Sequence, residues 1–568
     1  MTKKTLLFLV IVFLSLYHLL GQTSKEKLLN SSYQEHYVEF ETTNRIEIQD
    51  IANKFSIDNL VYLPEKKCYK ITVWLHQRDF ANFTALEIPF EILYAEQNDA
   101  KVSMANSIDE LMDGWTRYPT YLTYEALMSY FQNTYPALCK IDTILPATPK
   151  GRKILSAHIS TTLDGSVPKP KFFYSSTMHG DEAGGYYMML RLIHYILSNQ
   201  EDSKVNAILN SVDLWITPLE NPDGVYYSGD NTLGTSPVSS RANANGYDLN
   251  RNYPKAFTPI GSSYQPEVTA MMNFMNLHQF TMSANLHDGS ELFNYVWDLY
   301  TTKEMKHPDS DWWENIGRAF ADSCHFFAPN YFTDRDNGIT SGGNWYVIIN
   351  SRQDYANYHA RCREVTLEVS RRKVPNNNEL NTYWNNIKTS LLNYILAIHP
   401  GISGIVTDSL TGKPLQARIF INNHDQAHQR SDIYSQLPHG DYYRPLLPKT
   451  YSVTYSAKGY YSKTDTVTVF PYKSTIRDVK LLRNEIYNSD NEIIIYPNPV
   501  NNQLKIIVSD TWKNATVTLF SITGKQIEQF IICETESYID VTAYPNALYF
   551  IHFSKQGQEK VFKIVVQK

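Results

Sequence analysis

Three residues of this sequence have the types and spacing of a metal site. His179 and Glu182 stand three positions apart, where an apolar run ends and a helical pattern begins. His287 ends another apolar run, in NLHDG (285–289). A catalytic zinc ion typically takes three His or carboxylate ligands and leaves one position for water. These residues therefore form a candidate zinc site, although H-x-x-E alone is a weak signal and a histidine at a strand end is more often structural.

Charged residues elsewhere suit chemistry beside such a metal. The stretch RANANGYDLNRNYP (241–254) concentrates Arg241, Asn250 and Arg251 in a loop-like segment. One guanidinium can hold a carboxylate bidentately, and another can stabilise a developing oxyanion. The alternative interpretation is that the segment 241–254 is a solvated polar loop with no role in catalysis. Glu368 lies within the otherwise apolar TLEV, where a carboxylate needs a reason. The alternative interpretation is that Glu368 is an outward-facing strand residue.

The elements that must position these residues alternate between strand and helix from about 116 to 400. The stretch 182–197 carries apolar residues at helical spacing, and the expected strands are 171–178, 212–218, 281–286 and 364–369. Alternating β and α elements predict an α/β domain with a largely parallel or mixed sheet. Its polar residues cluster just after the strands, where such sheets place their sites.

Seven motifs in this region resemble, in order, those of the zinc metallocarboxypeptidase family. They are HGDE (179–182), NPDG (221–224), DLNRN (248–252), NLHDG (285–289), NGITSGGNWY (337–346), QDYANY (353–358) and CREVTLEVS (362–370). The resemblance is closest to the regulatory branch, which includes carboxypeptidases N, D and E. It implies a secreted enzyme that uses zinc to hydrolyse the last peptide bond of peptides or proteins.

The resemblance also implies roles for individual residues at the metal. His179, Glu182 and His287 match the zinc ligands. Asp248 matches the carboxylate that orients the first zinc histidine, and such a partner fixes the tautomer of the ring. Glu368 matches the general base, which takes a proton from the attacking water and hands it to the leaving amine.

Other matched residues face the substrate. Asn250 and Arg251 match the anchor for the terminal carboxylate of the substrate. Arg241 matches the residue that polarises the scissile carbonyl and stabilises the oxyanion. Tyr346 lies 22 residues before Glu368, which is the family's separation between its mobile substrate-binding Tyr and its catalytic Glu.

Two residues bear on side-chain preference. Asp298, eleven residues beyond His287, and Gln353, fifteen residues before Glu368, match the residues of the specificity pocket in the regulatory branch. A buried Asp beside an amide suits a basic side chain better than an apolar one, which leaves the charge unpaired. We therefore expect release of C-terminal Lys or Arg. The alternative is that Asp298 lies on the surface and the pocket is broad.

One position departs from the family pattern. Asn350-Ser351 stand where the family usually has Gly-Gly, in the loop after the binding Tyr. Glycines there allow unusual φ/ψ and close backbone approach. Asn tolerates left-handed geometry better than most residues, so the change affects the loop and the pocket rather than the metal chemistry.

The rest of the chain divides into smaller segments. Residues 1–22 have a basic start and a short apolar run, typical of a secretory signal peptide, with a membrane anchor as the alternative. The segment 23–115 reads as a small α+β accessory domain or pro-segment. Short alternating strands predict a β-sandwich over 401–483, where the regulatory branch carries a transthyretin-like domain. We identify no polar cluster in that sandwich.

The C-terminal end resembles a sorting domain. A polar linker (484–495) precedes a further all-β segment, 496–568, with YPNPV, LFSITGK and the ending VFKIVVQK. These motifs resemble the sorting domain of the type IX secretion system. The resemblance implies contact with that secretion machinery and a protein that is secreted or attached to the cell surface. No later apolar run is long enough to predict a membrane span in the mature chain.

Composition excludes several other classes. Of 568 residues, 43% are hydrophobic and 19% charged, which is globular composition. The net charge is −6, from 52 Lys+Arg and 58 Asp+Glu, so the chain has no basic excess for nucleic acid. The five cysteines show no metal-ligand spacing. The leading hypothesis is a secreted zinc carboxypeptidase that prefers basic residues. The alternatives are a carboxypeptidase for cell-wall or γ-linked peptides and a non-catalytic binding protein.

Overall fold

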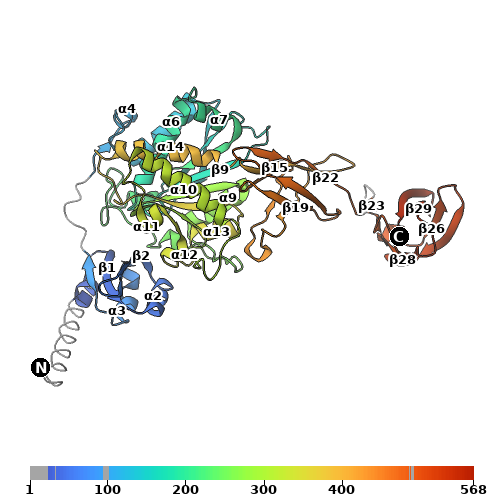
Figure 1. Cartoon of the computed structure of the whole chain (residues 1–568), viewed down its shortest axis with the longest axis horizontal. Helices are drawn as coiled ribbons and strands as arrows, with labels where there is room; N and C mark the ends of the chain where they lie inside the picture. Colours follow the sequence, from blue (N-terminus) through green and yellow to red (C-terminus); the bar gives the residue numbers. More distant parts are fainter. Residues whose placement is uncertain (1–23, 32, 94–101, 485, 488–491) are drawn as a thin grey trace, which may run out of the picture.

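The computed structural model describes residues 24–31, 33–93, 102–484, 486–487 and 492–568. The expected signal peptide (1–22) lies outside these residues. Figure 1 shows an N-terminal unit (residues 24–93) and two C-terminal β regions at opposite ends of a central α/β body. Within the described ranges, no helix is both long and apolar enough to cross a membrane.

The N-terminal unit is a four-stranded antiparallel sheet with two helices against it, α2 (Arg45–Ala52) and α3 (Phe80–Thr84). The strand order is β2-β3-β1-β4, and the strands are β1 (Glu35–Thr42), β2 (Ser56–Leu63), β3 (Cys68–His76) and β4 (Glu91–Leu93). Alternate residues point into a separate core, for example Ile71, Val73 and Leu75 of β3. This alternation fits a sheet with one covered face.

The central body is built on an eight-stranded mixed sheet in the order β13-β12-β14-β11-β9-β10-β8-β7. The four central strands, β10, β9, β11 and β14, run parallel. The strands are β7 (Cys139–Leu145), β8 (Ile154–Ile159), β9 (Lys171–Ser176), β10 (Asp213–Thr217), β11 (Met282–His287), β12 (Ser290–Tyr295), β13 (Ile339–Ser341) and β14 (Arg363–Ser370). The expected mixed α/β sheet is confirmed.

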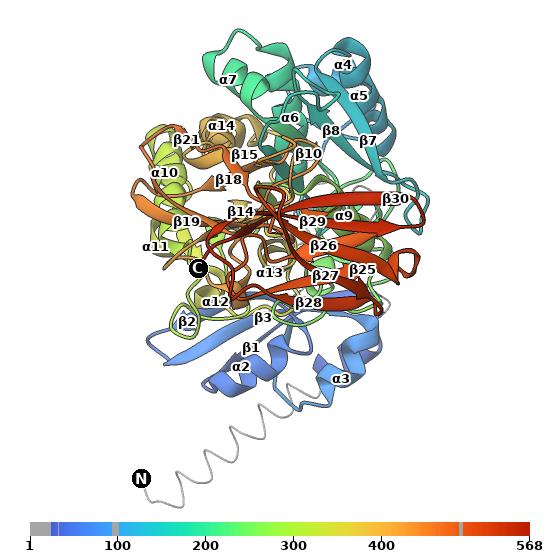
Figure 2. The same cartoon turned by 90° about the vertical axis from the view of Figure 1, so that its right-hand side faces the viewer.

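Helices cover both faces of this sheet (Figure 2). The first face packs against α5 (Tyr121–Thr134), α6 (Gly184–Ser198), α7 (Ser203–Ser211), α10 (Ser310–Phe327) and α14 (Leu380–Leu396). The second packs against α9 (Pro266–His278) and α13 (Arg352–Tyr358). In β9, Phe172 and Tyr174 enter the first core and Phe173 enters the second. Burial on both faces explains the continuous apolar runs in the sequence.

The boundaries differ from the sequence expectation at the point that matters most for the site. We expected a strand to Met178 and a helix from Glu182. Instead β9 ends at Ser176, because Thr177 takes a positive φ of 66° that turns the backbone. Helix α6 begins only at Gly184. The segment between them is therefore a loop at the carboxyl end of β9.

Two all-β regions follow, as expected. The first pairs the sheet β18-β15-β21, with β22 beside β15, against the sheet β17-β16-β19-β20. Its strands are β15 (Gly401–Asp408), β16 (Arg418–Ile421), β17 (Ile433–Tyr434), β18 (Asp441–Pro445), β19 (Thr450–Ser456), β20 (Lys463–Thr468), β21 (Ser474–Ile476) and β22 (Val479–Leu481).

The last region again pairs two sheets, β23-β24-β25-β28 and β27-β26-β29-β30, around its own core. Its strands are β23 (Ile486–Tyr487), β24 (Ile493–Tyr496), β25 (Gln503–Val508), β26 (Ala515–Ser521), β27 (Gln526–Ile532), β28 (Glu536–Asp540), β29 (Ala547–Lys555) and β30 (Gln558–Val566).

Candidate metal and active site

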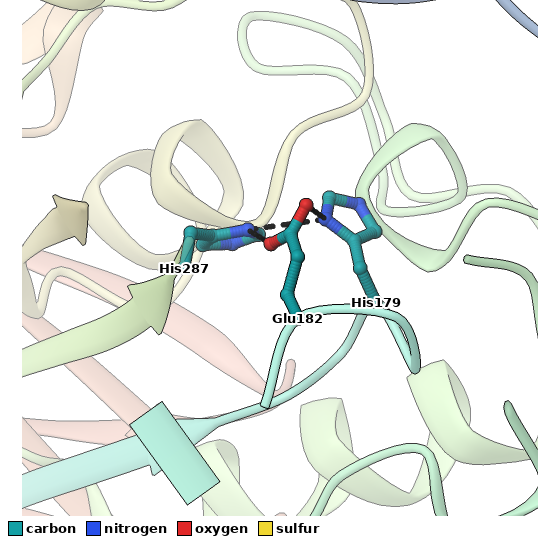
Figure 3. A group of neighbouring side chains, drawn as sticks. All are labelled: His179, Glu182 and His287. Atoms are coloured by element: carbon teal, nitrogen blue, oxygen red, sulfur yellow. Dashed lines mark hydrogen bonds and ion pairs between the residues drawn. The ribbon is translucent and has the colours of Figure 1, made fainter. Parts of the chain in front are cut away.

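Adjacent parallel strands bring the three candidate metal ligands together. His179 and Glu182 lie in the loop after β9, and His287 is the last residue of β11, which pairs with β9. Parallel neighbours end at the same edge of a sheet, so the three side chains meet there (Figure 3). All three are buried.

The donor atoms have the spacing that a metal requires. His179 Nδ1 lies 3.0 Å from Glu182 Oε1, and His287 Nδ1 lies 2.9 Å from Glu182 Oε2. The two Nδ1 atoms are 3.1 Å apart. A tetrahedral zinc with bonds of 2.0–2.1 Å separates its ligand atoms by roughly 3.3 Å. The donor set and its spacing therefore fit a zinc ion.

Asp248 fixes the orientation of the first histidine. Its Oδ1 accepts a hydrogen bond from His179 Nε2 at 3.0 Å, which leaves Nδ1 free to bind a metal. Burial opposes ionisation of Asp248, but the nearby Arg241 and His179 hold its pKa well below its usual value. Arg241 donates from Nε to Asp248 Oδ2 at 3.0 Å and from Nη1 to Glu182 Oε1 at 3.1 Å. Asp248 and Arg241 thus hold the ligand cluster from one side.

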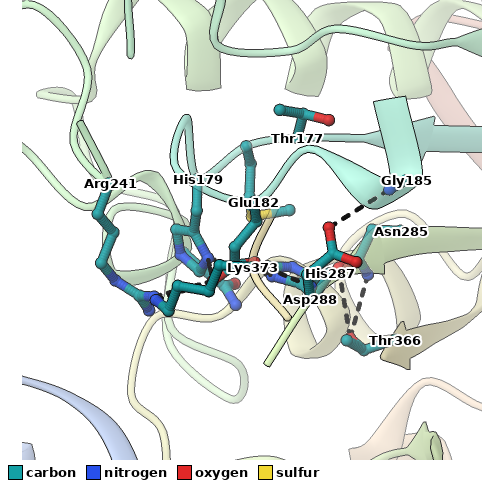
Figure 4. A network of polar contacts seen from close by, with 12 residues as sticks. Thr177, His179, Glu182, Gly185, Arg241, Asn285, His287, Asp288, Thr366 and Lys373 are labelled. Carbon is teal, nitrogen blue, oxygen red and sulfur yellow. Dashed lines mark hydrogen bonds and ion pairs between the residues drawn. The ribbon is translucent and has the colours of Figure 1, made fainter. Parts of the chain in front are cut away.

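Asp288 supports the cluster from the other side (Figure 4). Its Oδ2 accepts hydrogen bonds from the backbone N–H of Gly184 at 2.7 Å and of Gly185 at 3.3 Å, at the start of α6. A Cβ at position 184 would lie 2.4 Å from Asp288 Oδ1, so only glycine lets the carboxylate approach the helix. The sequence analysis missed Asp288, although it stands directly after His287.

Glu368 occupies the neighbouring strand. It is opposite His287 in the parallel pairing of β14 with β11. Burial, followed by the charges of Glu182 and Asp288, raises the pKa of Glu368 well above its usual value. The side chain is partly exposed and lines the same cavity as the ligand cluster.

One cavity of about 250 Å³ unites most of the expected site residues. They are His179, Glu182, Arg241, Asn250, Arg251, His287, Asp298, Tyr346 and Glu368. Asp248 and Gln353 lie behind the cavity wall and contact residues that line it. Asn250 also supports the wall, because its Oδ1 accepts from the backbone N–H of Arg352 at 2.9 Å.

Asp298 lies in the cavity wall, with 2% of the residue exposed. Gln353 Nε2 donates to its Oδ1 at 2.9 Å, and Asn294 Nδ2 lies 3.4 Å from the same oxygen. Burial raises the pKa of Asp298 to about 6. A Cβ at Gly342 would come within 1.9 Å of that oxygen, so the glycine leaves room for the carboxylate. The alternative of a surface Asp298 is wrong.

The departure at Asn350-Ser351 is accommodated in the loop. Asn350 takes a positive φ of 64°, the left-handed geometry that we expected Asn to tolerate. Ser351 caps α13, since its Oγ accepts from the N–H of Asp354 at 3.2 Å. Asp354 in turn accepts from the backbone N–H groups of Asp298 and Leu299, each at 2.9 Å. The loop therefore supports the wall of the cavity.

Sequence comparison now identifies the family. Residues 124–390 match a family model described as "Zinc carboxypeptidase". Carboxypeptidase M of Mus musculus is 31% identical over 388 residues, which cover 63% of this chain and 82% of that protein. The chain belongs to the zinc carboxypeptidase family. Carboxypeptidase D of Mus musculus is 32% identical over 360 residues, or 61% of this chain. This chain spans about a quarter of that protein, since the match covers 25% of it.

Two further comparisons concern the fold and the C-terminus. A solved carboxypeptidase A from Helicoverpa armigera has a TM-score of 0.46 at 15% identity and covers 64% of this chain and 97% of that one. Residues 494–567 match a model described as "Secretion system C-terminal sorting domain". This zinc carboxypeptidase family member therefore carries the sorting domain of an exported protein, as the sequence predicts.

Three further residues at the cavity were not found by sequence analysis. Lys373 Nζ lies 3.6 Å from Glu182 Oε1, and Asp58 and Asn59 of the N-terminal unit line the cavity. Lys373 follows β14 by three positions, so its place near Glu368 was a usable signal. Asp58 and Asn59 gave no signal, because nothing in the sequence shows that a distant strand lies against the site.

A second group of acids and histidine joins the α/β body to the first sandwich. Asp309, His424 and Asp425 lie close enough to share an ion. Arg444 Nη2 instead contacts Asp309 Oδ1 at 2.8 Å and Asp425 Oδ1 at 2.7 Å, and Arg363 Nη2 lies 3.1 Å from Asp309 Oδ2. Two guanidiniums supply the positive charge there, so the group is an interdomain ion cluster. It is a polar cluster that we did not expect in the sandwich.

Proposed function

We propose that this protein is an exported zinc-dependent carboxypeptidase that hydrolyses the C-terminal peptide bond of peptides or proteins and prefers to release Lys or Arg. The observation that carries this proposal is the single cavity that holds the His179–Glu182–His287 cluster, two guanidiniums and the buried Asp298 carboxylate. Family membership supports the same reaction.

One zinc ion per chain would be held by His179, Glu182 and His287. Bound there, it would polarise the scissile carbonyl and lower the pKa of a water ligand toward about 7. Asp248 keeps the His179 ring in the tautomer that presents Nδ1 to the ion. Asp288 holds the loop before α6, from which Glu182 extends.

Glu368 transfers the proton, and Arg241 stabilises the negative charge that develops on the carbonyl oxygen. Glu368 removes a proton from the attacking water and delivers it to the leaving amine. Its raised pKa favours the protonated form needed for the second step, and a cation at the ligand cluster would favour the ionised form needed for the first. Arg241 lies beside Glu182 and stabilises the oxyanion that develops on the carbonyl oxygen.

Arg251 and Asn250 select the end of a chain. Both line the cavity, and a guanidinium pairs well with a carboxylate that only a chain terminus supplies. Tyr346 lies on the same wall and contacts the bound peptide. This arrangement disfavours cleavage within a chain, because an internal peptide leaves Arg251 without a carboxylate partner.

Asp298 sets the preference for the released residue. Its carboxylate pairs with the cationic end of a Lys or Arg side chain, while Gln353 and Asn294 keep it in place. A Phe side chain in the same position leaves this buried charge unpaired.

The C-terminal sorting domain supports a role outside the cell. We propose that the type IX secretion machinery recognises residues 496–568, and that the protein then acts on extracellular peptides in a released or surface-attached form.

Release of amino acids from two matched peptides, one ending in Arg and one in Phe, tests the proposal. We expect the full chain to release Arg preferentially and a zinc chelator to stop it. Chelator-resistant release would contradict the zinc mechanism, and preferential release of Phe would contradict the role of Asp298. No release from either peptide by the zinc-loaded chain would contradict peptide hydrolysis.

A further inference from the structure

A second cavity, of about 310 Å³, lies where the α/β body meets the first sandwich, near α9 (Figure 1). The body contributes the end of α9 and the segment 359–361, which joins α13 to β14. The sandwich contributes residues of β17 and β18. No lining residue is shared with the cavity of the metal cluster. Small-molecule sites occur preferentially at such domain interfaces.

The buried part of this second cavity's wall is apolar. Met275 and Phe280 belong to the apolar core beside α9, and Ile433 belongs to the core of the sandwich. All three side chains are buried, yet they line the cavity. An apolar group of a ligand that packs against this wall is removed from water, which favours binding. The wall therefore suits a ligand with an apolar side chain.

Side-chain amides surround the apolar wall. Asn276, Gln279 and Gln416 are exposed residues that line the cavity. Gln436 joins its two sides, because its Nε2 donates to the backbone carbonyl oxygen of Gln279 at 2.7 Å and its Oε1 accepts from Lys171 Nζ at 3.3 Å. Each side-chain amide offers both donors and an acceptor, as a peptide group does. These residues therefore suit a ligand that contains peptide groups.

Arg361 gives the cavity a positive charge that its surroundings neutralise only in part. Its one ion-pair partner among the described residues is Asp432, whose Oδ2 lies 3.7 Å from Arg361 Nε and 2.8 Å from Arg418 Nε. Two guanidiniums thus share one carboxylate, and within the described part of the chain no Asp or Glu lines the cavity. Arg361 Nε has no hydrogen-bond partner there either.

The ring of Tyr434 positions this guanidinium. Arg361 Cζ lies 5.0 Å from the centre of the Tyr434 ring, and 26% of the Arg361 side chain remains exposed. A guanidinium that stacks on an aromatic face keeps its in-plane N–H groups, which match the two oxygens of a carboxylate. The cavity therefore presents a prepared partner for an anionic group beside an apolar wall.

We propose that this second cavity binds the C-terminal end of a peptide whose last residue is apolar, with the carboxylate on Arg361 and the last side chain against the apolar wall. The surrounding amides pair with the last peptide groups. A free amino acid fits less well, because its ammonium group finds no carboxylate in the lining. The lining contains none of the metal-cluster residues, so the peptide end is bound there without being cleaved. Binding at this site does not depend on the proposed function.

Isothermal titration calorimetry of the full chain with N-acetylphenylalanine and with its C-terminal amide tests this inference. The two probes share one body and differ in the charge of the last group. We expect saturable binding of the acid, and binding of the amide weaker by about tenfold or more, because the amide loses the charge-assisted contact. Arg361→Gln should weaken binding of the acid by a similar factor and leave binding of the amide unchanged. Tyr434→Leu should weaken binding of the acid less, because it removes only the ring beneath the guanidinium.

Arg251→Gln is the matched control, because it removes a guanidinium from the catalytic cavity instead. This variant should bind N-acetylphenylalanine like wild type. Loss of binding in Arg251→Gln but not in Arg361→Gln would place the probe in the catalytic cavity and overturn the inference. Equal binding of acid and amide, no saturable binding of the acid, or wild-type binding by both Arg361→Gln and Tyr434→Leu would also overturn it. Glucuronate, an acid without a peptide group or an apolar side chain, should bind more weakly than N-acetylphenylalanine, and tighter binding would contradict a peptide ligand.

Discussion

Replacing Asp298 by Asn should change which residue the protein releases rather than whether it releases one. The side chain is buried in the cavity wall, and Gln353 and Asn294 already contact its Oδ1. Asn keeps the shape but loses the charge that would pair with Lys or Arg. A hydrogen bond to a charged group contributes about 1.5–3 kcal/mol. We therefore expect kcat/KM for an Arg-ending peptide to fall by roughly 10- to 150-fold, since about 1.4 kcal/mol is a factor of ten.

The assay compares two peptides that differ only in a C-terminal Arg or Phe, within one preparation of each variant. The Arg/Phe ratio of kcat/KM cancels any difference between preparations in the fraction of active protein. For Phe we expect little change or a modest rise, because the buried charge that opposes an apolar side chain is gone. Asp311→Asn, on α10 and with a side chain 72% exposed, is the control and should leave the ratio unchanged. An unchanged ratio in Asp298→Asn would refute the reasoning about the pocket.

Three other predictions concern the pocket, the base and the interdomain cluster. The Arg/Phe ratio of kcat/KM should fall as the pH drops through about 6, because the raised pKa of Asp298 makes its carboxyl group neutral below that value. A pH series of kcat/KM checks this prediction, and a constant ratio from pH 8 to 5 would contradict it. Glu368→Gln should lower kcat by about 10²- to 10⁴-fold, because the variant loses the proposed general base. Its zinc content should stay unchanged, because Glu368 lies outside the ligand cluster. Full activity of this variant would show that Glu368 is not the base. Arg444→Met should lower the free energy of unfolding by about 3–5 kcal/mol in urea denaturation, since it leaves the buried Asp309 and Asp425 without this partner. Arg477→Met, with a side chain 44% exposed, is its control and should change stability by less than about 1 kcal/mol; equal losses in both variants would contradict the account.

The central sheet was predicted from local patterns, and the grouping of the candidate metal ligands was predicted from the ends of its strands. Apolar runs buried on both faces marked the parallel strands, and the polar residues after them marked the carboxyl edge. His179, Glu182 and His287 stand at that edge, where family resemblance also placed them. The predicted end of this strand at Met178 was wrong, because the positive φ that ends β9 before Thr177, a β-branched residue, leaves no clear trace in the sequence.

Contacts between distant segments could not be predicted in the same way. Asp58 lies 183 positions from Arg241 along the chain, and no periodicity in β2 shows that the strand faces a cavity. The interdomain cluster has the same origin, since Arg444 and Asp309 are 135 positions apart. Such pairs arise from the packing of whole units, which one sequence does not encode in any local pattern.

The most direct test of the central claim is a zinc titration of activity. The full chain is stripped of metal, and release of Arg from the Arg-ending peptide is followed as zinc is added back. We predict no release without metal and a linear recovery that saturates at one zinc per chain. Full release by the stripped chain, or saturation with zinc that restores no release, would contradict a zinc carboxypeptidase at His179, Glu182 and His287.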